Sequence, residues 1–231
     1  LLSEVLDAAE AAQLGPSFFE ATTAAAFLAF SRTPADAAVI EVGLGGRLDA
    51  TNIIPDPVVC GIAQLGIDHE AFLLAEEAGT PDDPLDRIAF EKSGIAKRGA
   101  PLVTQSYEKS MEREIGQQAA RARASFHPRG SDWNAAVYEG QLHYRDAMSR
   151  ISAPLPALAG SWQADNAALA IAMLRHQSAV RVSETAIRAG LGWARWPARM
   201  QPLHTGPLVN LLPEGSEAWL DGCHNPAGAE L

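Results

Sequence analysis

Short, largely apolar runs alternate along this chain with longer stretches of helical composition. Three such runs lie at residues 37–42, 58–65 and 101–105. Apolar runs of this length are typical of strands that are buried on both faces of a parallel sheet. The stretches between them at residues 84–93 and 108–124 are predicted as helices, the first closed by a glycine. This alternation predicts an α/β domain whose mainly parallel sheet is flanked by helices.

Four further helices are predicted on either side of this region. Residues 2–14 end at a Gly-Pro stop signal, and the Ala-rich apolar residues 19–31 predict a buried helix. The other two helices are predicted at residues 161–177 and 183–191. Together with the three strands, these helices complete the expected helical layers of the domain.

The remaining segments have a different pattern. Residues 131–147 alternate around Glu139-Gly140, which predicts a hairpin of a small antiparallel sheet. Strands are predicted at residues 207–212 and 218–220, and Asn225-Pro226 has the form of the cap and first position of a helix. A strand, a turn and a helix start predict the beginning of a second α/β domain.

Composition narrows the possible partners. The 231 residues, 47% of them hydrophobic, suffice for a substantial core, and no stretch approaches the roughly 18 apolar residues of a membrane span. The net charge of −10 argues against a nucleic-acid partner, although it does not exclude a nucleotide. The two cysteines fit no zinc or redox spacing. We therefore expect a cytoplasmic protein with no membrane and no nucleic-acid partner.

Two predicted strand ends carry side chains that suit a metal ion. Glu41 lies near the end of the first run, and His69 follows the second run in the sequence Gly-Ile-Asp-His. Open α/β sheets bind ligands at the carboxyl ends of their strands. Oxygen and nitrogen ligands without a thiolate favour Mg²⁺, although Mn²⁺ would also fit. Each residue alone is also consistent with an ordinary polar loop, and the pair favours a metal site.

Lys92 and Asn166 are weaker candidates. A lysine in the last turn of a helix ordinarily complements the helix dipole, and an ammonium group cannot ligate Mg²⁺ without modification. Asn166 lies on an otherwise apolar predicted helix, where its amide would either bind an adenine edge or make a local polar contact.

Three polar residues near the expected domain junction complete the candidates. Arg199 is placed where a phosphate clamp would act on domain closure. Asp221 and His224 occupy a strand-to-helix turn, which is a frequent ligand position. The glycine-rich run that begins at Gly43 fits neither the dinucleotide fingerprint nor the P-loop pattern, and no P-loop occurs in the chain.

Six motifs taken together resemble the folylpolyglutamate/dihydrofolate synthases of the Mur ligase superfamily. They occur in the family's order and approximate spacing, and they are EVGLGGRLDATN, GIDH, IAFEKSGIAKRG, WQADNAALA, WPARMQ and DGCHNPAG. The resemblance runs from about Phe19 to the end of the chain, and its first motif is highly specific. It implies a Mur-ligase-like central ATPase domain over residues 1–197 and the start of a Rossmann-like C-terminal ligase domain over residues 198–231.

The resemblance implies an ATP-dependent ligase that adds L-glutamate to dihydropteroate or to reduced folates. ATP phosphorylates the substrate carboxylate in this family, the glutamate amine attacks the acyl phosphate, and Mg²⁺ stabilises the charge. Such an enzyme is expected to act as a monomer. The alternatives are another Mur-type ligase, such as a muramyl peptide synthetase, and an inactive fragment that retains the fold.

The family's functional positions are carried over one by one. Glu41 and His69 match the magnesium ligands, and Lys92 matches the lysine that is carbamylated. The remaining matches are to substrate-lining positions at Leu48, Asp49 and Ala50 and to ATP-contacting positions at Asn166, Arg199, Asp221 and His224.

Several departures from the family pattern accompany these matches. The family's phosphate loop and most of its C-terminal domain are expected outside this chain. Trp162 stands where a histidine is common, and Ala198 stands where a glycine is common.

Overall fold

The computed structural model describes residues 1–67, 73–75 and 77–223. Its centre is a three-stranded sheet in the order β1-β2-β3, in which both neighbouring pairs are parallel. The strands are β1 (Cys60–Ile62), β2 (Pro101–Thr104) and β3 (Ser125–Pro128). The predicted runs at residues 58–65 and 101–105 therefore do form parallel strands, and β3 is a further strand that the apolar pattern did not indicate.

Two helices cover one face of this sheet. They are α4 (Pro84–Ser93), which begins at the Asp83 cap, and α5 (Lys109–Ala122). Ile88 of α4, Ile115 of α5 and Leu102 of β2 are fully buried in the core that they share. The thiol of Cys60 lies in the same core and donates a hydrogen bond to the carbonyl of Ile95 at 3.3 Å. Burial raises the pKa of the Cys60 thiol to about 11.

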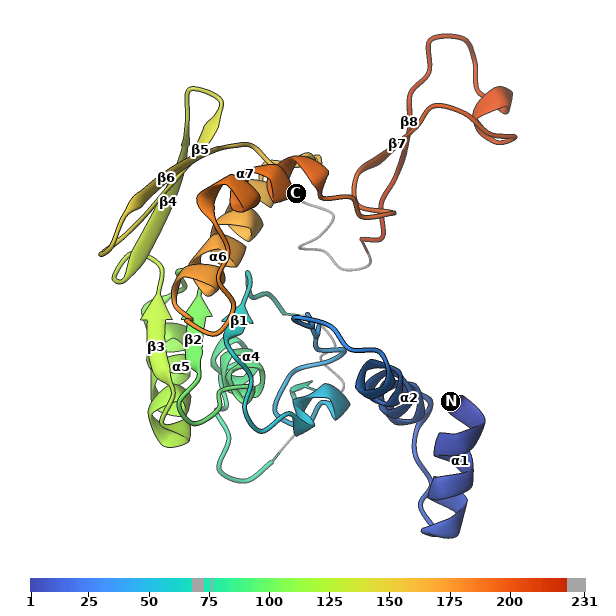
Figure 1. The fold of residues 1–231 in the computed structure, drawn as a ribbon, viewed down its shortest axis with the longest axis vertical. Helices are drawn as coiled ribbons and strands as arrows, with labels where there is room; N and C mark the ends of the chain where they lie inside the picture. The colour runs from blue at the N-terminus through green and yellow to red at the C-terminus, as the bar shows by residue number, and fades with distance from the viewer. Residues whose placement is uncertain (68–72, 76, 224–231) are drawn as a thin grey trace.

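The other face is covered by α6 (Gln163–Arg175), which also packs against a second sheet (Figure 1). That sheet is antiparallel and consists of β4 (Trp133–Tyr138), β5 (Gln141–Asp146) and β6 (Arg150–Pro154). A helix between two sheets is apolar on most of its surface, which explains the Ala-rich sequence of α6. Val103 of β2 belongs to this core, whereas its neighbour Leu102 belongs to the core under α4, as the alternation of a strand requires.

The hairpin predicted around residues 139–140 is confirmed. Glu139 and Gly140 both have positive φ, 49° and 72°, and β4 and β5 pair directly on either side of them. Two positive φ angles define the turn type whose twist matches that of paired strands. Beyond β6, α7 (Glu184–Trp193) begins at the Ser183 cap and packs against that strand.

The ends of the described chain extend away from this centre (Figure 1). At the N-terminal side lie α1 (Leu2–Ala11) and α2 (Phe18–Arg32), the second of which starts with a capping box. At the other end β7 (Gln201–Leu203) and β8 (Ala218–Leu220) form an antiparallel pair. The single-turn helices are η1 (Ala50–Ile53) and η2 (Val209–Leu211).

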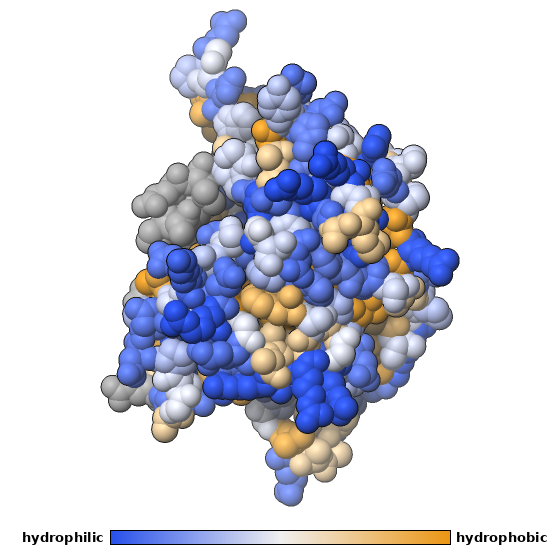
Figure 2. Space-filling model, turned by 90° about the vertical axis from the view of Figure 1, so that its left-hand side faces the viewer, coloured by the Kyte–Doolittle hydropathy of each residue, from blue (hydrophilic) through white to orange (hydrophobic). Residues whose placement is uncertain are grey.

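Figure 2, viewed from the side of the antiparallel sheet and α5, shows a mostly hydrophilic face on which apolar groups are scattered. Within the residues that the structure describes, no helix is long and apolar enough to cross a membrane.

Three predictions from the apolar pattern are wrong. Residues 37–42 form no strand but an irregular segment, in which Val39 is 97% exposed, because no described strand pairs with them. The helix predicted at residues 19–31 is present as α2, but Ala21 is its one buried residue. Residues 207–212 form turns and η2, since Pro207 and the exposed leucines around it have no partner strand. The helix start predicted at Asn225 lies outside the described residues.

Candidate functional site

The segment from Glu41 to Asn52, called here the motif loop, is docked on the C-terminal end of α4. The backbone N–H of Arg47 donates a hydrogen bond to the carbonyl of Glu91 at 2.8 Å. A Cβ atom on Gly46 would lie 2.9 Å from the carbonyl oxygen of Lys92, and one on Gly94 would lie 2.5 Å from the Cα of Arg47. The two backbones therefore meet so closely that only glycine fits at these points.

A charged network fastens the same contact. Arg47 donates to both carboxylate oxygens of Glu91, at 3.1 and 3.0 Å, and it also pairs with Glu77. Arg87, one turn before Glu91 on α4, pairs with the same two carboxylates. The side chains of Glu91 and Arg87 are each 6% exposed. Hydrogen bonds to Glu91 raise the pKa of Arg47, so this guanidinium stays charged.

The motif loop also holds its own shape. The carboxylate of Asp49 accepts hydrogen bonds from the backbone N–H groups of Leu44 and Thr51, each at 2.9 Å, and from the Thr51 hydroxyl. The side-chain amide of Asn52 donates to the carbonyls of Arg47 and Gly94, each at 3.1 Å. Asp49 and Asn52 thus position the loop, a role that the sequence motif alone did not reveal.

A cavity of about 570 Å³ lies over the motif loop. All three predicted substrate positions, Leu48, Asp49 and Ala50, line it. Phe19 of α2 closes one side, with its ring so near Gly43 that a Cβ atom there would lie 2.2 Å from it. The network of Arg47, Arg87, Glu77 and Glu91 also lines the cavity, so charged groups and apolar groups face the same space.

The predicted metal ligands are only partly described. Glu41 is exposed on the irregular segment before the glycines, and His69 lies outside the described residues. The end of β1 is held by Tyr107, whose hydroxyl donates to the carbonyls of Ile62 and Ala63 at 2.8 and 2.7 Å. Burial raises the pKa of Tyr107, so the phenol keeps the proton that these bonds need. Tyr107 thus holds the end of β1, a role that the sequence patterns did not indicate.

Lys92 lies in the last turn of α4, as predicted, and is partly buried. Its backbone carbonyl faces Gly46. The contact between residues 46–47 of the motif loop and residues 91–94 at the end of α4 is called here the seam. The structure therefore brings the lysine motif and the glycine motif together, although they are more than forty residues apart in the chain.

Asn166 is exposed near the start of α6, where its amide donates to the side chain of Gln163 at 3.2 Å. The preceding residue, Asp165, accepts two hydrogen bonds. The Arg129 guanidinium donates to its carboxylate at 2.6 Å, and the Gln105 side-chain amide donates to its backbone carbonyl at 2.7 Å. Gln105 follows β2 and Arg129 follows β3, so these side chains tie the start of α6 to the strand ends. Neither was a sequence candidate.

Arg199 and Asp221 lie close together in a segment called here the junction, residues 198–200 and 221–223. Asp221 accepts hydrogen bonds from the N–H groups of Met200 and Cys223, at 2.6 and 2.7 Å. These bonds, the one from Met200 first, lower the pKa of Asp221, and the nearby charge of Arg199 acts in the same direction. Ala198 has a positive φ of 56°, which explains why a glycine is favoured at this position.

The predicted site residues thus form two groups among the described residues. Leu48, Asp49 and Ala50 share a cavity next to the seam with Lys92, and Arg199 lies beside Asp221. No described contact links these groups to each other or to Asn166, and His224 lies outside the described residues.

Sequence and structure comparisons agree on the relatives of this chain, although no family model matches it. It is 32% identical over 236 residues to the dihydrofolate synthase/folylpolyglutamate synthase of Bacillus subtilis, covering 98% of this chain and 50% of that protein. It is 34% identical over 215 residues to the Escherichia coli protein of the same name, with 93% and 45% covered. The structure of E. coli FolC in complex with DHPP and ADP matches with a TM-score of 0.75 and 32% identity, covering 93% of this chain and 46% of that one. The chain therefore spans about half the length of these relatives.

Proposed function

Since the chain belongs to the family of folylpolyglutamate and dihydrofolate synthases and spans about half of their length, we propose that it forms the central part of an ATP-dependent ligase. This ligase joins L-glutamate to the carboxylate of dihydropteroate or of a reduced folate. The observation that carries the proposal is the cavity over the motif loop, because the three residues matched to substrate positions line it together.

In this proposal the substrate lies against Leu48, Asp49 and Ala50. Leu48 is 79% exposed and offers apolar surface, whereas the Asp49 carboxylate is already engaged by backbone groups and acts by holding the loop. A volume of about 570 Å³ is in the usual range for small-molecule sites. A folate or pteroate ring system is accommodated by such a mixture of apolar and polar lining.

The donor chemistry of Glu41 fits Mg²⁺, which is commonly held by one or two carboxylates together with substrate phosphates. We assign Glu41 and His69 as its protein ligands, His69 from the sequence match alone. When bound, Mg²⁺ stabilises the charge on the transferred phosphoryl group. Lys92 is proposed to carry a carbamate, whose oxygens extend this negative environment. Its support is the seam that places α4 against the motif loop.

ATP is proposed to contact Asn166, Arg199, Asp221 and His224. Two backbone hydrogen bonds fix the Asp221 carboxylate, and the exposed guanidinium of Arg199 near it suits a phosphate contact. The whole enzyme is proposed to act as a monomer in the cytoplasm, and its mass in solution measured by light scattering tests the first of these statements.

The direct test is a substrate requirement for ADP release. The purified full-length protein should release ADP only when a pteroate or folate and L-glutamate are supplied together with MgATP. Release with UDP-linked muramyl peptides and their amino acids would instead assign the protein to another Mur-type ligase. No release with either set would leave only the fold and refute the proposed activity.

Two variants locate the chemistry. Glu41→Gln removes the charge of the proposed Mg²⁺ ligand and should lower kcat at least about a hundredfold, the scale on which electrostatic groups contribute. Glu214→Gln is the matched control, because Glu214 is an exposed carboxylate outside both groups of site residues, and it should leave kcat unchanged. Equal rates for both variants would remove Glu41 from the site. Native mass spectrometry in bicarbonate should show the extra mass of a carbamate, and Lys92→Arg should abolish it.

A further inference from the structure

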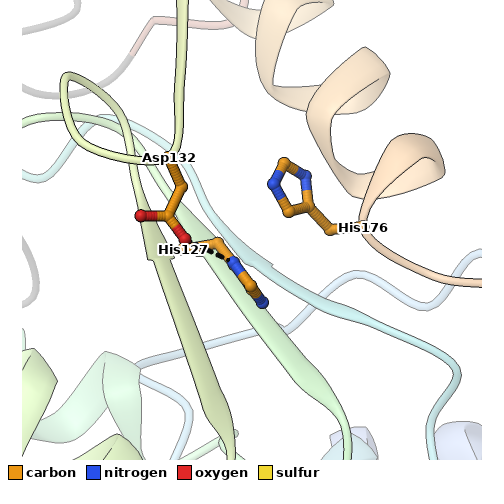
Figure 3. A group of neighbouring side chains, drawn as sticks. All are labelled: His127, Asp132 and His176. Carbon is orange, nitrogen blue, oxygen red and sulfur yellow. Dashed lines mark hydrogen bonds and ion pairs between the residues drawn. The ribbon is translucent and has the colours of Figure 1, made fainter. Parts of the chain in front are cut away.

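A second cavity, of about 730 Å³, lies on the opposite side of the parallel sheet from α4. The end of β3, the antiparallel sheet and the C-terminal end of α6 border it. It is separate from the cavity over the motif loop, and the two share no lining residue. Two histidines and an aspartate, His127, Asp132 and His176, converge at its wall (Figure 3).

Each of the three side chains is held by the backbone around it. His127 belongs to β3, and Asp132 sits in the tight turn after that strand, where its N–H donates to the carbonyl of Pro128 at 3.1 Å. The Nδ1 of His127 and the Oδ2 of Asp132 are 2.7 Å apart. The carboxylate and the imidazole therefore lie side by side, and both atoms become available to one metal ion when the bond between them opens.

His176 caps the C-terminal end of α6 and is oriented by its own helix. Its Nδ1 lies 2.8 Å from the carbonyl oxygen of Ala172, and a carbonyl only accepts, so Nδ1 carries the proton. The lone pair is then on Nε2, and Figure 3 shows the ring turned toward His127 and Asp132. A backbone carbonyl that fixes the tautomer in this way is a usual feature of histidine ligands.

The distances are close to those of a metal site. One ligand atom from each residue lies within 4.8 Å of the others, and the two imidazole rings are 4.5 Å apart at a tilt of 44°. Tetrahedral bonds of about 2.0 Å separate ligand atoms by about 3.3 Å, so small side-chain rotations would bring the three atoms to that spacing. All three residues are partly buried, which limits competition from water.

We propose that His127, Asp132 and His176 form a binding site for a divalent transition-metal ion of the Zn²⁺ class. Two imidazoles and one carboxylate match the ligand preference of Zn²⁺, whereas Mg²⁺ takes mainly oxygen ligands. Three protein ligands leave a fourth position that faces the cavity. Three arginines, Arg145, Arg150 and Arg175, line the same cavity. Arg175 also forms an ion pair with Asp146 at 2.9 Å. The fourth position accordingly suits an anionic ligand, which these guanidinium groups favour.

The test is direct Zn²⁺ binding by the full-length protein after treatment with a chelator and in excess Mg²⁺, measured by isothermal titration calorimetry. One Zn²⁺ ion per chain should bind at this site, and His176→Ala should weaken that binding at least about tenfold. His204→Ala is the matched control, because His204 is an exposed histidine outside the cluster. It should bind as the unmodified protein does. Equal affinity in His176→Ala and His204→Ala would overturn the proposal, as would absence of binding to the unmodified protein.

A second measurement keeps the proposal testable if His176→Ala fails to fold. Co²⁺ in a low-symmetry tetrahedral site gives intense visible absorption bands, and Asp132→Asn should abolish these while circular dichroism shows that the fold is intact. Unchanged Co²⁺ bands in Asp132→Asn would remove the carboxylate from the site and refute the ligand set. Neither readout depends on ligase activity, so loss of the proposed function would not affect the result.

Discussion

The seam between the motif loop and α4 and the junction around Asp221 both carry motifs of the same family, yet they are built in opposite ways. In the seam, two backbones meet without room for a Cβ atom, and the Glu91 and Arg87 side chains that fasten it are nearly excluded from water. In the junction, Arg199 is exposed, and the structure is held by backbone hydrogen bonds to Asp221 and by the bond from Gly222 to Ala198.

The difference shows that two motifs of one family can be supported by different kinds of structure. Buried charges and close backbone packing in the seam make local opening costly in free energy. Few buried contacts and exposed backbone hydrogen bonds make opening of the junction cheap. We therefore expect substitutions in the seam to change global stability and substitutions in the junction to change local order only.

The largest effect is expected from Glu91→Gln. Removing this buried charge leaves the guanidinium groups of Arg47 and Arg87 with the half-exposed Glu77 as their carboxylate partner among the described residues, and breaking a buried pair costs about 3 kcal/mol. Chemical denaturation measures the change in the free energy of unfolding. Glu4→Gln is the control, because the pair of Glu4 with Arg32 is exposed. It should leave the transition unchanged, and equal shifts in both variants would show that the seam is not a stabilising centre.

A smaller effect is expected from Gly94→Ala. Gly94 has a helical φ of −60°, so alanine suits its backbone, but the new Cβ atom would lie 2.4 Å from the Cβ of Arg47. Overpacking of this kind costs about 1–3 kcal/mol, measured as a loss in the free energy of unfolding.

The matched variant for that test is Gly116→Ala in α5. There the added Cβ atom would be 3.5 Å from Phe126, an ordinary contact, and alanine in a helix interior should stabilise the protein by about 0.5–1 kcal/mol. A lower free energy of unfolding in Gly94→Ala and a higher one in Gly116→Ala would confirm that the seam excludes a side chain. Stabilisation by Gly94→Ala would contradict the close approach of the two backbones.

The smallest effect is expected at the junction, from acid or from Asp221→Asn. The folded-state pKa of Asp221 is lowered by the hydrogen bond from Met200. The stabilisation from the ionised carboxylate is therefore complete above the ordinary aspartate pKa of about 3.9, and it is lost as the pH falls through the lowered value. Amide resonances of Met200 and Cys223 should shift together in that acidic range, while the melting temperature at neutral pH changes little in Asp221→Asn. A midpoint above pH 3.9 for the shift of these resonances would contradict the lowered pKa of Asp221.

Much of the central fold was predictable because its signals are local. The cap at Asp83 with Pro84, the turn at Glu139-Gly140 and the long Ala-rich apolar run of α6 each fix their own element. The strand predicted at residues 37–42 failed because a strand needs a neighbour, and no neighbour is encoded in its own residues. β3 was missed for the converse reason, since its short sequence Ser-Phe-His-Pro becomes a strand only beside β2.

The candidate site divides in the same way. Motif order indicated which residues to examine, and the structure groups Leu48, Asp49 and Ala50 around one cavity. Residues that act by supporting others, such as Arg47 and Tyr107, were missed because their partners are distant in the chain. The cluster at His127 was missed because its members come from a strand, a turn and a helix end.

The environment of Cys60 also makes the junction experimentally accessible. The thiol at Cys60 is buried and keeps its proton to about pH 11, whereas Cys223 is exposed at the edge of the junction. Since the thiolate is the reactive form, a maleimide or spin label applied near neutral pH should modify Cys223 alone. Within this chain, Cys223 is therefore a single attachment point for a spectroscopic reporter at the junction, without any substitution in the core.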